Sequence, residues 1–179
     1  MKYALTIIVF LTTFILHGCT SAPLSSYSDN TPKLIPQDFF NGTLKAHGIV
    51  KNRSGKVIRY FNADITAHWK NGVGTLDEKF IFNDGEIQYR TWTLTPKTTS
   101  TSAFTATAGD VVGIGEGDFS GNALRLNYTL SVKYNDSTIN LRVDDWMWLT
   151  DSKTLLNEST LTKYGFKVGS VQLVITKKE

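Results

Sequence analysis

The chain has 179 residues and a formal net charge of +3, with 19 basic and 16 acidic side chains. Such a small charge argues against nucleic acid as a partner. The single cysteine excludes a disulfide within the chain, and with only three histidines too few ligands remain for an ordinary zinc site. We therefore expect no metal and no cofactor, and a fold that is stabilised by packing alone.

The first 18 residues predict a signal peptide. Lys2 precedes an apolar run over residues 3–16, and this run ends shortly before Cys19. The pattern resembles the lipobox of bacterial lipoproteins, in which cleavage leaves a lipid-modified cysteine at the new N-terminus. A transmembrane anchor with a buried cysteine is the alternative. It is disfavoured because the run is shorter than the roughly 18 to 20 residues that a span needs.

The residues after the predicted cleavage site indicate a location and a linker. Thr20 follows Cys19, and in lipoprotein sorting signals this implies outer-membrane delivery in a Gram-negative host. A lipid on Cys19 would hold the protein in the cell envelope, facing the periplasm, with the membrane as its partner. Residues 19–37, rich in Ser and Pro, predict a flexible tether. Residues 38–179 have the size of one domain.

The domain itself shows the pattern of an all-β protein. Short segments rich in Val, Ile, Thr, Tyr and Phe alternate with Gly, Asn and Asp turns about every ten residues. Residues 57–69 alternate apolar and polar side chains, interrupted by Arg59, and Asn83-Asp84-Gly85 predicts a hairpin turn. About ten strands are expected, at residues 42–52, 57–69, 76–82, 87–94, 103–108, 113–119, 124–134, 138–149, 155–161 and 168–176.

Ten sequential antiparallel strands favour a single closed up-and-down barrel over a sandwich, because closure removes the exposed edges. We expect a barrel of the lipocalin or fatty-acid-binding type, and a monomer. Such a barrel is wide enough to hold one small ligand. Whether its lumen is open is left undecided by the sequence.

Asp144 and Asp145 are the first candidates for a binding site. Adjacent strand residues point to opposite faces, so one of the two carboxylates faces inward, and the sequence leaves open which one. Trp146 shares the face of Asp144 and is a further candidate. The buried carboxylate needs a partner, for which Arg59, Arg90 and Arg142 are the candidates. A structural Asp–Arg pair and a polar anchor for a ligand are both compatible with this pattern.

Arg90 and Trp92 are the second pair of ligand-binding candidates because they share one face of their strand. A guanidinium beside an indole suits a carboxylate or phosphate head group, although surface packing of the same two side chains is the alternative. Gly113, Gly115 and Gly117 alternate without a following helix. They therefore predict a bend or a flat wall for a bulky neighbour rather than a phosphate loop.

Several short motifs together resemble a known family of bacterial lipoproteins, the domain of unknown function 3833. The motifs are Phe39-Phe40-x-Gly42, Arg53-x-Gly55-x-Val57-x-Arg59, Gly74-Thr75-Leu76-x-Glu78, Asp84-Gly85-Glu86 with Arg90-x-Trp92, Ala108-Gly109-Asp110-Val111-x-Gly113, Gly121-Asn122-Ala123, Asp144-Asp145-Trp146-Met147, and Lys163-Tyr164-Gly165 with Gly169. The resemblance implies a lipocalin-like barrel on an outer-membrane lipoprotein, and it supplies no catalytic residues.

Three functions remain open from the sequence. The first is a membrane-tethered barrel that binds or shuttles a fatty acyl or other apolar ligand. The second is a small isomerase or hydrolase that acts on a lipid, and the third is an envelope protein with a filled core. A carrier needs only volume and one polar anchor, whereas an enzyme needs an activated group in the lumen. The sequence therefore favours the carrier over an enzyme.

Overall fold

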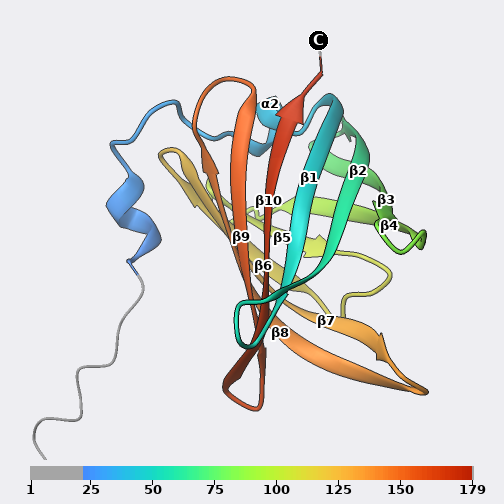
Figure 1. Cartoon of the computed structure of the whole chain (residues 1–179). Coiled ribbons are helices and arrows are strands. Elements are labelled where there is room, and N and C mark those ends of the chain that lie inside the picture. Colours follow the sequence, from blue (N-terminus) through green and yellow to red (C-terminus); the bar gives the residue numbers. More distant parts are fainter. Residues whose placement is uncertain (1–21, 179) are drawn as a thin grey trace, which may run out of the picture.

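The computed structural model describes residues 22–178, which contain a closed barrel of ten antiparallel strands (Figure 1). Each strand pairs with its neighbours in sequence, and β10 pairs with β1 to close the barrel. The predicted up-and-down barrel is thus confirmed. The strands are β1 Gly42–Asn52, β2 Val57–Lys70, β3 Val73–Phe82, β4 Ile87–Pro96, β5 Ala103–Thr107, β6 Gly115–Ser120, β7 Ala123–Tyr134, β8 Ser137–Leu149, β9 Thr154–Lys163 and β10 Phe166–Lys177.

The alternation of β2 shows how the sequence specifies the inside of the barrel. Phe61, Ala63, Ile65 and Ala67 are buried, whereas the residues between them are exposed. Residues directly opposite each other on neighbouring strands point to the same side. The pairing register therefore identifies the inward-facing residues of the other strands from those of β2.

The hairpin between β3 and β4 forms where its turn residues predict it. Gly85 has a φ of +87°, a conformation that L side chains adopt rarely and glycine adopts readily. The Phe82 N–H donates to the Glu86 carbonyl, and the Gly85 N–H donates to the Phe82 carbonyl, both at 3.0 Å. This prediction is confirmed.

The two ends of the barrel differ. Because the strands alternate in direction, the β1–β2, β3–β4, β5–β6, β7–β8 and β9–β10 connections all lie at one end, which we call the mouth end. The other end, the capped end, is covered by the short helix α2, Pro36–Phe39, and the residues beside it (Figure 1). Leu34, Phe39 and Phe40 are buried there, and the Trp69 indole N–H donates to the Phe40 carbonyl at 2.7 Å.

The chain ahead of α2 also packs on the barrel. The 3-10 helix η1, Leu24–Tyr27, places the Tyr27 ring 5.9 Å from that of Trp146, and the Leu34 N–H donates to the Gly121 carbonyl at 2.7 Å. Much of the segment predicted as a flexible tether, residues 19–37, is therefore docked. Residues 19–21, with Cys19, and the predicted signal peptide 1–18 lie outside the described residues.

The barrel and its cap are a self-contained folding unit. Every strand has two neighbours, and one core of buried side chains runs from the cap segment through the strands. Closure leaves no whole strand at a free edge, which favours independent folding without aggregation. Within residues 22–178, no helix has the length and apolar character that crossing a bilayer requires.

Candidate functional site

The lumen is filled near the capped end. The inward-facing side chains there are mostly aliphatic or aromatic, and each has less than a tenth of its surface exposed. Gly117 lets the Phe104 ring lie flat against β6, since a Cβ at this position would lie 2.2 Å from that ring. The packing role predicted for Gly117 is confirmed. The buried inward-facing residues of this half include Leu44, Ala46, Ile65, Ala67, Leu76, Leu94, Phe104, Ala106, Leu124, Leu126, Leu149, Leu155 and Ile175.

Toward the mouth end, many inward-facing side chains are apolar but only half-buried, although Phe61, Leu141 and Val143 remain buried. On β9, for example, Leu155 is fully buried at the capped end, whereas Leu161 nearer the mouth retains exposure to solvent. The lower half of the lumen thus presents an apolar lining that solvent reaches, and we call this part of the lumen the recess. Its half-buried apolar lining comprises Val50, Phe80, Phe82, Tyr128, Leu130, Val132, Ile139, Leu161, Val171 and Leu173.

The wall of this lower half is incomplete between β4 and β7. The strands β5 and β6 are short, and β4 pairs with β5 only over Thr93–Pro96. Below that point the β5–β6 connection takes their place. Its Val112 N–H donates to Thr129, and the Ser131 N–H donates to Asp110, both at 2.8 Å. The connection is therefore pinned to β7 by its backbone.

A polar cluster lies behind this connection, on the inner face of β3 and β4. Arg90 reaches from β4 across the gap, and its Nε and Nη2 donate to Asp110 Oδ2 at 3.0 and 2.8 Å. Its Nη1 lies 3.9 Å from Glu78 Oε2. Side chains therefore join β4 to the β5–β6 connection where backbone pairing between them is missing, and Glu78 of the neighbouring strand β3 lies beside them.

Glu78 is the most perturbed acid of the cluster. Its pKa is raised from 4.5 to about 7, chiefly by burial and also by the carboxylates of Asp110 and Asp145, against the lowering effects of Arg90 and a hydrogen bond from Trp92. Two acceptor atoms in the cluster, Glu78 Oε2 and Asp110 Oδ1, are buried and have no hydrogen-bond donor. Such unsatisfied acceptors are costly, and they mark a place where a donor fits.

Asp145 is the inward-facing member of the predicted Asp144–Asp145 pair. Its Oδ1 accepts hydrogen bonds from Asn157 Nδ2 at 2.5 Å and from Ser159 Oγ at 2.7 Å. Burial raises its pKa to about 6, although the two hydrogen bonds and the charge of Arg90 lower it. The prediction that an arginine would be its direct partner is wrong, because the amide and hydroxyl of β9 already occupy that position.

Asp144 and Trp146 point outward, away from the lumen. Asp144 accepts from Arg125 Nε and Nη2 at 2.6 and 3.0 Å, and the Arg125 guanidinium carbon lies 5.0 Å from the centre of the Trp146 ring. The Trp146 and Trp148 rings stack at 5.7 Å. These contacts form a surface cluster on the outside of β7 and β8, separate from the lumen.

The other predicted site residues divide between the lumen and the surface. Arg90 and Trp92 both face inward, so their predicted shared face is confirmed, and Trp92 packs edge-to-face on Tyr128 at 5.2 Å. Arg59 sits at the mouth, paired with Asp84 and Glu86. Arg142 is exposed on the outer face of β8. The structure therefore does not bring Arg59 or Arg142 to Asp145.

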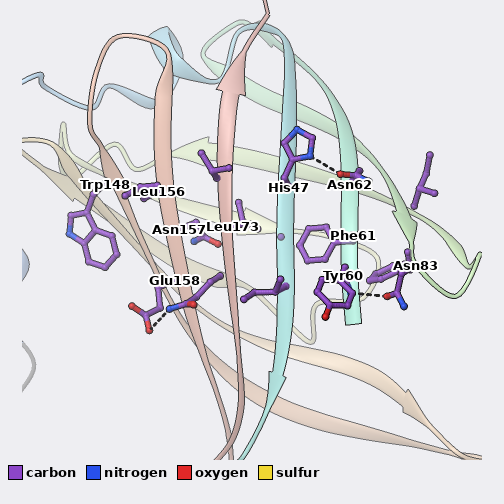
Figure 2. A pocket seen from close by; sticks show the side chains of 16 residues that line it. His47, Tyr60, Phe61, Asn62, Asn83, Trp148, Leu156, Asn157, Glu158 and Leu173 are labelled. Atoms are coloured by element: carbon purple, nitrogen blue, oxygen red, sulfur yellow. Dashed lines mark hydrogen bonds between the residues drawn. The ribbon is translucent and has the colours of Figure 1, made fainter. Parts of the chain in front are cut away.

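A hollow of about 700 Å³ lies mainly on the outer face of the barrel. Most of its lining side chains face outward, as His47, Tyr60 and Glu158 do (Figure 2), whereas four of them face inward, namely Phe61, Phe82, Asn157 and Leu173. His47 Nδ1 and Asn62 Oδ1 are 2.6 Å apart beside it. Because its walls are exposed and hold no buried ionisable group, we place the candidate site in the lumen.

The fold defines the class of protein, a closed up-and-down β-barrel of ten antiparallel strands. The chain belongs to the family described as "Protein of unknown function (DUF3833)", whose profile matches residues 13–177. The family predicted from the short motifs is thus confirmed. No curated protein matches the chain.

Two solved structures are similar in fold. The S-type phycobiliprotein lyase CPES from Guillardia theta matches with a TM-score of 0.60 and 10% identity, over 78% of this chain and 88% of that chain. A protein of unknown function from the DUF3598 family of Nostoc punctiforme matches with a TM-score of 0.54 and 15% identity, over 89% of this chain and 53% of that chain. At these identities the likeness extends to the fold alone.

Proposed function

We propose that this protein is a membrane-anchored carrier that binds a fatty acyl or other apolar ligand in the lower half of its barrel. One observation carries the proposal: the inward face is mostly apolar, and in its lower half many of these apolar side chains remain partly exposed to solvent. A recess lined by apolar side chains with a few converging polar groups is the usual form of a small-molecule site. The barrel shared with a phycobiliprotein lyase supports a role for the lumen in ligand binding.

The anchor is proposed to be lipid on Cys19. A single acyl chain binds a membrane only marginally, whereas the several chains of a bacterial lipoprotein give stable attachment. Intact-mass analysis of the full-length protein, extracted from membranes, measures this directly. A mass increase located on Cys19 supports the anchor, and a free thiol on that residue contradicts it.

The binding proposal is tested by filling the recess. Leu161 faces inward in the lower half, and its neighbour Thr162 faces outward on the same strand. We expect Leu161→Trp to weaken binding of the neutral apolar dye N-phenyl-1-naphthylamine at least about tenfold, with Thr162→Trp as the matched control that leaves binding unchanged. Binding that is absent in the unmodified barrel, or equal in both variants, would refute the proposal. Native mass spectrometry of the membrane-extracted protein would then identify a bound ligand.

A further inference from the structure

The charges of the lumen are arranged for a ligand with a particular polar group. Three carboxylates, those of Glu78, Asp110 and Asp145, are gathered around one guanidinium, that of Arg90. Two of the three guanidinium nitrogens already donate to Asp110. A carboxylate or phosphate head group would therefore find the arginine engaged and would face two further acids.

The unpartnered atoms in the cluster point to the same chemistry. Glu78 Oε2 and Asp110 Oδ1 are buried acceptors without a donor, and the Glu78 side chain has only 12% of its surface exposed. Both atoms lie beside the recess, since Glu78 faces inward on β3 and the Asp110 connection closes the gap in the wall. A ligand that donates hydrogen bonds would satisfy them, and one that only accepts would not.

We propose that the ligand is an amphiphile whose polar end is a cationic amine, held by Glu78 and Asp110, with its apolar chain along the lower lumen. Arg90 then acts as a positioning residue, because it fixes the Asp110 carboxylate without meeting the ligand's charge. This inference rests on the proposed function, since it names the head group of the ligand that the recess would bind.

The test compares three amphiphiles with the same chain length. The barrel unit, residues 22–179, is titrated at neutral pH with dodecylamine, dodecanol and dodecanoate, with tryptophan fluorescence as the readout because Trp92 borders the cluster. We expect dodecylamine to bind at least about tenfold more tightly than dodecanoate, with dodecanol between them. Glu78→Gln and Asp110→Asn should each remove most of this preference while leaving dodecanol binding nearly unchanged. Asp144→Asn, an outward-facing carboxylate, is the matched control.

The outcomes separate the two proposals. If dodecanol binds and dodecylamine binds no more tightly, the head-group inference is overturned while the carrier proposal stands. Dodecanoate that binds as tightly as dodecylamine overturns it in the same way. If none of the three amphiphiles binds, the carrier and the head-group inference both fail. The Asp110→Asn substitution lies in a connection and not in a strand, so it keeps the test decisive if Glu78→Gln does not fold.

An independent observation concerns the outside of the mouth end. Within residues 22–178, ten of the twelve large apolar side chains that are exposed lie in or beside the five mouth-end connections. Tyr164 and Phe166, at the β9–β10 hairpin, are 87% and 65% exposed. The ten residues, which we call the rim, are Ile58, Tyr60, Ile81, Ile87, Tyr89, Val112, Ile114, Tyr134, Tyr164 and Phe166.

The charge around the rim is positive. Three of the five connections, together with the strand ends beside them, carry six basic side chains and a single acidic one, Asp136. The acidic residues of the other two connections are already paired, Asp84 and Glu86 with Arg59, and Asp110 with Arg90. The six basic residues are Lys51, Arg53, Lys56, Lys133, Lys163 and Lys167.

We infer that the rim rests on a lipid surface with anionic head groups, with the barrel mouth turned toward the bilayer. Aromatic side chains with one polar atom, and lysines with long apolar stems, are the residues that settle at a membrane interface. The positive charge complements anionic lipid, at about 1 kcal/mol for each basic residue near the surface. This contact is separate from the Cys19 anchor, because it uses only barrel residues.

The test uses the barrel unit without its anchor, residues 22–179, in flotation with phosphatidylglycerol vesicles and with phosphatidylcholine vesicles. We expect binding to phosphatidylglycerol that falls at least about tenfold in a Tyr164→Ser, Phe166→Ser double variant. Leu156→Ser is the matched control, because Leu156 is exposed but lies away from the rim. Equal binding by all variants, or none by the unmodified barrel, overturns the inference. A dimer in sedimentation that the double variant abolishes overturns it too, by assigning the rim to a second copy of the chain.

Discussion

The two halves of the lumen use the same strands for different purposes. Near the capped end the inward side chains are buried, whereas toward the mouth many of them remain partly exposed to solvent. The halves differ because α2 and Phe40 close one end, while the short strands β5 and β6 leave the wall near the other end incomplete. We therefore expect stability and the proposed ligand binding to be carried by separate parts of one barrel.

The largest expected difference between the halves is the loss in free energy of unfolding when an inward-facing leucine is replaced by alanine. Leu155 and Leu161 both face inward on β9, but Leu155 is completely buried and Leu161 is not. We expect Leu155→Ala to lower the free energy of unfolding by about 3 kcal/mol, because it leaves a cavity in packed surroundings. Leu161→Ala should cost about 1 kcal/mol. Urea titration measures both values, and equal losses would show that the lower half is packed as tightly as the upper.

The adjacent acids of β8 provide a second, smaller contrast. Asp145→Ala leaves the buried donors of Asn157 and Ser159 without their acceptor, which we expect to cost about 2 kcal/mol. Asp144→Ala removes a partly exposed pair with Arg125 and should cost less than about 1 kcal/mol. Thermal unfolding of both variants checks this order. A larger loss for Asp144→Ala would mean that the outer cluster, not the inner one, holds β8 in place.

The smallest effect expected is a dependence of stability on pH. The folded protein raises the pKa of Glu78 from 4.5 to about 7, so the folded state keeps this proton to higher pH than the unfolded chain. The stability linked to that proton is fully present below pH 4.5 and is lost as pH rises through 7. We expect a loss on the order of 1 kcal/mol between mildly acidic and mildly alkaline pH.

Glu78→Gln is the control for this pH effect, because glutamine stays neutral throughout. Its stability should change less over the same range than that of the unmodified protein. Asp145, whose pKa rises to about 6, contributes in the same direction and remains in both proteins. Denaturant midpoints of both proteins at a series of pH values give the comparison. If the two midpoints change equally with pH, Glu78 is not the cause of the pH dependence.

The sequence predicts most of the barrel because its signals are local. Alternation in residues 57–69 and the Asn83-Asp84-Gly85 turn identify strands and hairpins without any long-range information. The shared face of Arg90 and Trp92 follows from the same alternation. Each of these predictions depends only on neighbours in the chain.

The candidate site was harder to predict because it depends on contacts between distant segments. Glu78 interrupts an otherwise apolar strand face, as Arg59 does, and this was the one signal that could have marked it. Asp110 joins the cluster only because two short strands leave a gap that its connection fills. Both faces of the Asp144–Asp145 strand carry one acid and large apolar side chains, so the alternation could not decide which face is buried.

The packing of η1 on the barrel sets how far the domain can stand from its anchor. A free linker of 18 residues would reach roughly 20 to 25 Å on average. Because η1 begins at Leu24, a lipid on Cys19 would be joined to this helix by five peptide steps, at most about 18 Å when fully extended. The short connection would then keep the barrel close to the membrane surface, and the barrel would not reach far into the periplasm.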